Sequence, residues 1–308
     1  MGRREPAIAD CRVPIEPAAI PPASNRQSAI GNRRFRHPRR LIVTADDFGR
    51  SPGINASVLR AHREGILTAA SLMVNEEAYT EAVALAKEAP DLGVGLHLTL
   101  LRGHATLPQE RIPGLINDRR EFGNNPVAVG VRYCFDRALR SQLRDEIAAQ
   151  FEKFRATGLR LDHINGHLHM HLHPVVFQIL MEHAGAWGIR HLRLTCDRCW
   201  LNLRLARGRL AWRLGHAILF RCFWWVIYPL LQRKGIRHTC GVFGLMQDSR
   251  VDERFILGLL PRLPTGDCEL YSHPSLDQFP HEFEALVSPR VKERVRQLGI
   301  GLIRYQDL

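Results

Sequence analysis

The chain has 308 residues, of which 45% are apolar and 24% charged, so it is long enough for one large α/β domain or two ordinary ones. Its seven cysteines are scattered and odd in number, which argues against a disulfide framework and favours a reducing compartment. The net charge of +12 is concentrated in residues 1–40 (+6) and 198–238 (+9), which leaves −3 for the rest. This distribution suggests contact with an anionic surface and argues against a nucleic-acid-binding fold.

The first residues differ in composition from the rest. Residues 1–38 are rich in Pro and Arg and show no hydrophobic period, so we predict a disordered basic tail followed by one domain over residues 39–308. No apolar run of about 7–15 residues, as in a signal peptide, occurs near the start. We therefore expect a cytoplasmic protein.

From residue 40 onward, predicted strands alternate with predicted helices. Strands are expected at 40–45, 69–74, 93–100, 159–165, 190–195, 269–273 and 301–305. Helices are expected at 51–63, 79–89, 140–156, 174–185 and 289–298. This alternation predicts a parallel sheet covered on both faces. Polar residues at the carboxyl ends of several strands favour a barrel-like closure over an open sheet.

An insert at residues 198–243 interrupts this alternation. It is basic and contains four of the five tryptophans, Trp200, Trp212, Trp224 and Trp225. Arg221 and Pro229 interrupt its apolar run, which argues against a helix that spans a membrane. Two interpretations remain open: an amphipathic segment in the membrane interface, or a helical hairpin packed on the domain.

A pair of adjacent acids follows the first predicted strand. Asp46 and Asp47 lie directly after the buried run Leu41–Val43, where their like charges repel and burial adds to the cost. A divalent cation, or a proton shared with a substrate, would remove that cost. His97 in the third strand and the stretch 163–169, with three histidines, could complete a metal site. One Asp and two His leave coordination positions open, as catalysis requires.

These motifs resemble the YdjC/ChbG-like carbohydrate deacetylases over residues 40–305. The matching pieces are Thr-Ala-Asp-Asp-Phe-Gly after the first strand, Gly-Leu-His-Leu on the third and His-x-x-x-His-x-His after the fourth. The resemblance implies a distorted TIM-like α/β barrel that removes acetyl groups from N-acetylated sugars by hydrolysing an amide C–N bond. It also implies that Asp47, His97 and His167 bind one divalent metal ion and that Asp46 is the general base.

Residue 165 departs from the common family pattern. Many members have His-x-Asp-Ser-His where this chain has His163-Ile164-Asn165-Gly166-His167. This form, the tryptophan-rich insert and the motif around Glu269 resemble the hopanoid-biosynthesis branch called HpnK. That resemblance implies an N-acetylglucosaminyl hopanoid as substrate. The metal is Mg²⁺ in common descriptions of the family, whereas two imidazoles and a carboxylate suit Zn²⁺.

Three further residues are candidates for the reaction. His273, at the end of another strand, could protonate the leaving amine or could simply hold a loop before Pro274. Arg193, at the end of the fifth strand, could bind substrate hydroxyls or form an exposed salt bridge. His169 is a candidate substrate contact.

The sequence can also be compared with functions other than deacetylation of a lipid-linked sugar. Amidohydrolase and phosphoesterase barrels would place a His-x-His motif after the first strand, which here ends in Asp-Asp. A deacetylase of soluble chito-oligosaccharides and a catalytically silent membrane-surface binding module are the alternatives. For the enzyme we expect peripheral contact with the inner face of the cell membrane through residues 198–235 and no nucleic-acid partner. A homo-oligomer is left open.

Overall fold

Parallel strands form the central sheet of the protein. The structure is a computed structural model that describes residues 39–196, 201, 204–205, 210–247 and 249–308. The sheet of these described residues has seven strands, and all of its pairings are parallel. The strands are β1 (Arg39–Phe48), β2 (Ala69–Leu72), β3 (Gly93–Leu98), β4 (Ile164–Gly166), β5 (Gly241–Phe243), β6 (Gly266–Ser272) and β7 (Gly301–Leu302).

The sheet curls until its edges are joined. Its order is β4-β3-β2-β1-β6-β5, and β7 pairs with the first residues of β1. Residues 190–196, which do not form a regular strand, bridge β4 and β5. Arg193 N–H donates to Ile164 O at 3.0 Å, and Val242 N–H donates to Cys196 O at 3.4 Å. These bonds complete a distorted TIM-like barrel, which confirms the expected fold class.

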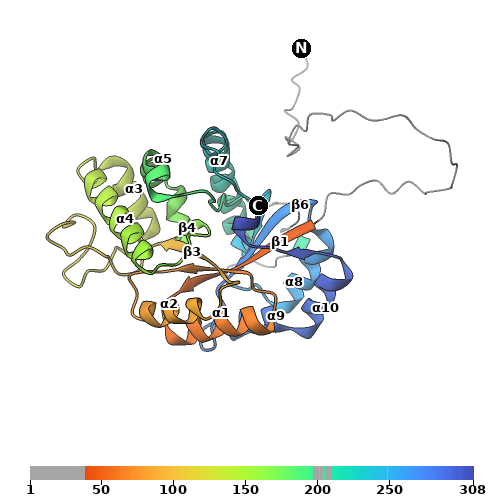
Figure 1. Ribbon diagram of the computed structural model, residues 1–308. Helices are drawn as coiled ribbons and strands as arrows, with labels where there is room; N and C mark the ends of the chain where they lie inside the picture. The colour runs from red at the N-terminus through yellow and green to blue at the C-terminus, as the bar shows by residue number, and fades with distance from the viewer. Residues whose placement is uncertain (1–38, 197–200, 202–203, 206–209, 248) are drawn as a thin grey trace, which may run out of the picture. The chain divides into compact units, whose positions relative to one another are not determined.

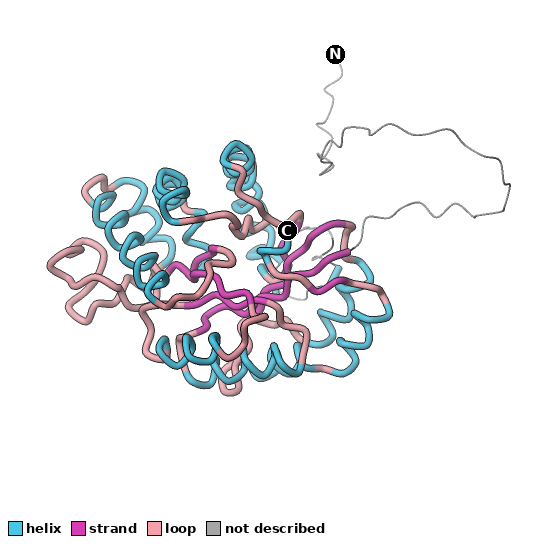
Figure 2. Tube along the Cα trace, viewed as in Figure 1, coloured by secondary structure: helices cyan, strands magenta, loops and turns pink. Residues whose placement is uncertain are grey.

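Helices surround the strands. Figure 1 shows α1, α2 and α9 on one side of the strands and α3, α4, α5 and α7 on the other, and Figure 2 shows the strands between these two groups. The helices are α1 (Pro52–Glu64), α2 (Tyr79–Lys87), α3 (Pro126–Phe135), α4 (Leu139–Ala156), α5 (Pro174–Trp187), α7 (Leu210–Lys234), α8 (Glu253–Leu259), α9 (Pro280–Val287) and α10 (Pro289–Gln297). The main core consists of buried apolar side chains from the strands and from the helices around them.

Most predicted elements are present, with shifted ends. The helix expected at 51–63 is α1, which Ser51 caps by accepting from Ile54 N–H. The strand expected at 159–165 starts only at Ile164, and the one expected at 190–195 is reduced to isolated bridges. Four elements, α3, α8, α9 and β5, were not predicted from the sequence. The α3 sequence has β-branched residues and Gly130, which disfavour a helix, but Asn125 starts it by accepting from two N–H groups.

The two basic segments are described to different extents. The predicted tail at 1–38 lies outside the described residues, as do parts of the insert between 197 and 209. The rest of the insert forms α7 and leads into β5. Among the described residues, one helical stretch, Arg213–Lys234, is long and apolar enough to cross a membrane on length and composition alone.

Candidate metal centre

Asp46 and Asp47 point toward the same site although they are neighbours on a strand. Successive side chains of a regular strand point to opposite faces. Here Asp47 has φ +62°, and the register between β1 and β2 shifts between Ala45 and Phe48. A non-glycine residue with positive φ costs about 1–3 kcal/mol, and such strain is concentrated at functional sites. The irregular end of β1 therefore turns both buried carboxylates inward.

Asp47 meets two histidines from neighbouring strands. Its Oδ1 lies 3.2 Å from His97 Nε2, on β3, and 2.9 Å from His167 Nδ1, directly after β4. The candidate ligand atoms of the three residues lie within 4.8 Å of one another, and all three side chains are buried. Burial alone would raise the pKa of Asp47, but the adjacent His167 and His97 hold it well below its usual range.

Asp46 binds an arginine instead of a histidine. Arg193 donates from its two terminal nitrogens to Asp46 Oδ2 at 2.6 Å and Oδ1 at 2.9 Å. The same guanidinium donates to Glu269 Oε1 through Nε (3.0 Å) and a terminal nitrogen (2.7 Å). Burial by itself would raise the pKa of Asp46, but the charge and hydrogen bonds of Arg193, together with the nearby His97 and His273, lower that pKa, so Asp46 is ionised at neutral pH.

Arg193 differs from what the sequence led us to expect. Its side chain is completely buried, so the exposed salt bridge considered above is wrong. Its guanidinium lies 4.5 Å from the centre of the Tyr271 ring, in addition to its two carboxylate partners. This arrangement directs Arg193 at protein groups, whereas the sequence prediction was a contact to substrate hydroxyls.

His169 and His273 lie around the same end of the barrel. His169 Nε2 is 3.1 Å from the Tyr271 hydroxyl, and its Nδ1 is 3.2 Å from Thr195 Oγ1. His273 follows β6 and is half-buried, with its backbone N–H donating to Glu282. Its ring lies 5.9 Å from that of Tyr271. Both histidines therefore have a ring next to Tyr271.

Glu269 and Tyr271 are site residues that were not predicted from the sequence. Both lie on β6, and with His273 they occupy alternate positions. Alternate residues of a strand share a face, so this spacing of two was the signal that all three point into the barrel. Thr44 and Asp46 on β1 follow the same rule, and Thr44 Oγ1 donates to Glu269 Oε1 at 2.7 Å.

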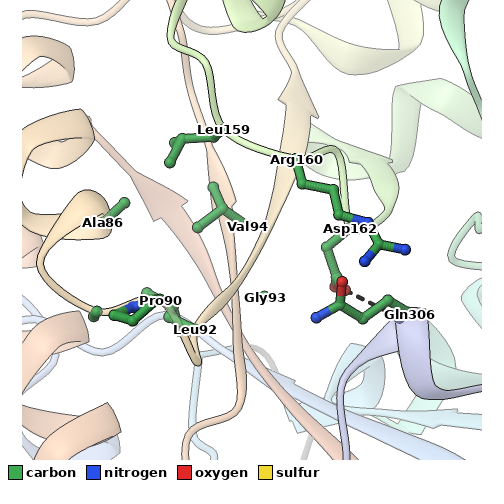
Figure 3. A pocket seen from close by; sticks show the side chains of 10 residues that line it. Ala86, Pro90, Leu92, Gly93, Val94, Leu159, Arg160, Asp162 and Gln306 are labelled. Carbon is green, nitrogen blue, oxygen red and sulfur yellow. Dashed lines mark hydrogen bonds between the residues drawn. The ribbon is translucent and has the colours of Figure 1, made fainter.

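A cavity of about 240 Å³ lies at the other end of the strands. Figure 3 shows it beside Gly93, the first residue of β3, and Asp162, which precedes β4. The Asp-His-His group lies instead at the carboxyl ends of β1, β3 and β4. Parallel barrels place their active sites at the carboxyl ends, so this cavity is not the candidate catalytic site.

The donor set fits one divalent ion. Two imidazole nitrogens and a carboxylate oxygen converge, and three protein ligands leave positions for water and substrate. Such a set of ligands suits zinc and other first-row transition metals, although a carboxylate is also a ligand for magnesium. The barrel and this buried centre together define an α/β barrel with a candidate divalent-metal site at the carboxyl ends of its strands.

Comparison with known proteins gives the family. The profile of the YdjC-like proteins matches residues 40–297, and the chain belongs to that family. A carbohydrate deacetylase of Geobacillus stearothermophilus is 41% identical over 88% of this chain and 98% of that protein. A chitooligosaccharide deacetylase of Salmonella paratyphi B is 33% identical over 60% of this chain and 73% of that protein.

A solved structure supports the fold. It is that of an Enterococcus faecalis V583 protein proposed to cleave cellobiose phosphate, with a TM-score of 0.69 and 24% identity. The match covers 88% of this chain and 98% of that one.

Proposed function

We propose that the protein is a metal-dependent carbohydrate N-deacetylase, which hydrolyses the amide bond of an N-acetylated amino sugar to acetate and a free amine. The observation that carries this proposal is the convergence of Asp47, His97 and His167 beside an ionised Asp46. Its context supports the same reaction, because relatives in the YdjC-like family are named carbohydrate and chitooligosaccharide deacetylases.

Asp47, His97 and His167 would hold the metal. When bound there, a divalent ion supplies polarisation of a carbonyl and activation of a water. The short contacts of Asp47 Oδ1 with both imidazoles support this assignment, since they bring the three candidate ligand atoms close enough together to bind one ion.

Asp46 is the proposed general base. A carboxylate has about four lone-pair positions. Arg193 occupies two of those on Asp46, and Asn165 Nδ2 takes a third, on Oδ1 at 3.2 Å. One position on Oδ2 is left to accept the proton of the attacking water. The three donors fix the orientation of the Asp46 carboxylate, so its free position on Oδ2 can accept a proton only from a water molecule at one place in the site.

The roles of the other predicted residues follow from their positions around the site. We assign His273 the protonation of the leaving amine, because a half-buried imidazole after β6 can hold a proton near the site. His169 remains a proposed substrate contact through its position beside Tyr271. For Arg193 the ion pairs favour a positioning role for Asp46 over contact with substrate.

Metal content and acetate release test this function. We expect the purified chain to contain about one divalent ion and to release acetate from N-acetylglucosaminyl lipid extracts or chito-oligosaccharides. His167→Ala should lose the metal and at least about 10³-fold of the activity, because the metal lowers the activation barrier by several kcal/mol. His183→Ala on α5, outside the centre, is the control and should keep both. A chain that is folded and metal-loaded but releases no acetate would support the silent binding module instead.

For the substrate we propose a lipid-linked sugar, the N-acetylglucosaminyl hopanoid of the HpnK branch. The Asn165-containing motif and the insert carry this finer assignment. The position of α7 supports it, because its Phe220 ring lies 5.1 Å from that of His169, so an apolar helix borders the site. Soluble chito-oligosaccharides are the alternative, favoured by the name of the Salmonella relative, a chitooligosaccharide deacetylase.

We further propose that α7 makes peripheral contact with the inner face of the cell membrane. One side of α7 is buried in the core through Phe220, Ile227 and Leu231, which argues for a helix lying on the membrane and against one that crosses it. Its other side exposes Ile218 (65%), Trp225 (61%) and Val226 (67%), among other apolar residues. The surrounding segment 198–238 has nine basic residues and no acid, which complements an anionic lipid surface.

Vesicle binding tests this contact. We expect the protein to cosediment with vesicles containing anionic phospholipid. Trp225→Glu/Val226→Glu should weaken binding at least tenfold, because burying each of these two apolar side chains in the membrane contributes a free energy of about 1.5–3 kcal/mol. The matched control is Val127→Glu/Val131→Glu, which alters an exposed apolar pair on α3. Equal binding by the α7 variant and the wild type would contradict the contact. Acetate release from a soluble N-acetyl sugar should be the same in all three proteins.

A further inference from the structure

A buried hydrogen-bond chain leads from the amino-terminal end of the barrel to His97. Asp162 Oδ2 lies 2.9 Å from His163 Nδ1, and His163 Nε2 lies 3.0 Å from Ser71 Oγ. Asn165 Nδ2 donates to Ser71 Oγ at 2.8 Å, and Asn165 Oδ1 lies 2.7 Å from His97 Nδ1. All five side chains are at most 2% exposed.

The orientation of Asn165 follows from its neighbours. Asp46 is paired with Arg193 and is an acceptor only, so the amide atom that faces Asp46 Oδ1 at 3.2 Å must be the nitrogen. The amide oxygen then faces His97 Nδ1, which must carry the hydrogen. In the neutral imidazole this leaves the lone pair on His97 Nε2, which is directed toward Asp47 Oδ1, where the proposed ion would bind.

The other end of the chain requires the same orientation. If Asp162 accepts from His163 Nδ1, then His163 Nε2 has a lone pair and accepts from the Ser71 hydroxyl. Ser71 Oγ is then free to accept from Asn165 Nδ2. A flipped Asn165 would place its oxygen against Asp46 Oδ1 and against Ser71 Oγ, whose hydrogen is already donated to His163, so it is opposed at both contacts.

The surrounding residues are shaped to hold this chain. A Cβ on Gly93 would approach Asp162 Oδ2 to 2.7 Å, and one on Gly95 would approach the His163 ring to 2.6 Å, so only glycine fits at these positions of β3. Tyr305 stacks on the His163 ring at 4.5 Å. Figure 3 shows Gln306 beside Asp162, and its N–H donates to Asp162 Oδ1 at 3.0 Å.

We infer that Asp162, His163, Ser71 and Asn165 form a positioning chain that fixes the His97 tautomer competent to bind metal through Nε2. The inference rests on the proposed metal centre. Residues behind a ligand that fix its tautomer typically change metal affinity about 10–100-fold when they are replaced. His163 contacts neither Asp46 nor any of the proposed ligands in the hydrogen bonds described, so an effect of His163 on metal affinity would have to pass along the chain.

The test is zinc affinity of the full-length protein after its metal has been removed with a chelator. His163→Phe keeps an aromatic ring on Tyr305 but removes the acceptor for Ser71, and it should raise the zinc Kd about tenfold. The His97 Nδ1 proton, observed by NMR in the zinc-loaded protein, should exchange faster with water. Ser71→Ala should act in the same direction and serves if His163→Phe does not fold.

His191→Phe is the matched control. It removes another buried imidazole, whose Nδ1 contacts the Asp162 backbone carbonyl at 2.8 Å, but it leaves the chain intact. Its zinc Kd should stay within about twofold of the wild type. Wild-type affinity and exchange in both His163→Phe and Ser71→Ala would overturn the positioning chain while leaving the metal centre standing. A wild-type protein that binds no divalent ion would overturn the metal centre, and the chain with it.

Discussion

Replacing Asp46 with Asn is expected to lower kcat for acetate release by about 10²–10⁴-fold while metal remains bound, because a general base contributes about that factor. Asp46 is not among the three converging ligand residues, so metal content should not fall. An Asn at this position also directs its amide hydrogens at Arg193 or Asn165, which donate to Asp46 in the wild type. The measurements are steady-state kinetics and elemental analysis on the same samples.

The control for this change is Asp267→Asn. Asp267 pairs with Arg40 near the amino-terminal end of β6, away from the site, so the same acid-to-amide change should leave kcat nearly unaltered. If Asp46→Asn retained full activity with metal bound, the general-base assignment would be wrong. Because the pKa of Asp46 is lowered, its protonation should not limit activity until the pH falls well below the ordinary range of a carboxyl group.

The sequence could predict which elements carry the chemistry but not how they are turned. A barrel with polar residues at the ends of several strands follows from alternating patterns and from the motifs around Asp47, His97 and His167, and the structure brings these three together. The convergence of Asp46 and Asp47 depends on the positive φ of Asp47, which no local pattern indicates. Strict alternation would have placed one of the two on the opposite face.

Contacts between residues far apart in the chain could also not be predicted from the sequence. Arg193 looked like a surface residue at a strand end, but it is buried because Asp46 and Glu269 reach it from two other strands. Ser71 lies in an apolar strand, where nothing marks it as a partner of Asn165. The predicted strand at 190–195 failed because this segment makes only isolated bridges while it closes the barrel. Contacts between residues of different strands therefore determine the burial and the partners of these side chains, which the local sequence pattern does not indicate.

Replacing Arg193 with Met is expected to destabilise the protein by about 3–5 kcal/mol at pH 7, since breaking a buried ion pair leaves charge without compensation. Here two carboxylates, on Asp46 (3% exposed) and Glu269 (completely buried), would lose their shared partner. Urea unfolding measures the loss. Arg193→Met/Glu269→Gln should recover part of it, because one of the two buried charges is gone. Arg40→Met, which breaks the half-exposed pair with Asp267, is the control and should cost about 1 kcal/mol or less.

In Arg193→Met, the contribution of Asp46 to stability should depend on pH with the opposite sign to that in the wild type. In the wild type the folded pKa of Asp46 lies below the unfolded one, so its contribution to stability is present above the unfolded pKa and is lost as the pH falls through the folded one. Without Arg193, burial, which is the largest influence on the pKa of Asp46, should outweigh the lowering by His97 and His273 and raise the folded pKa above the unfolded value, so the folded state binds the proton more tightly. Arg193→Met should therefore gain stability relative to the wild type when the pH is lowered from 7 to 5. A parallel loss in both proteins over that range would show that Arg193 does not control the ionisation of Asp46.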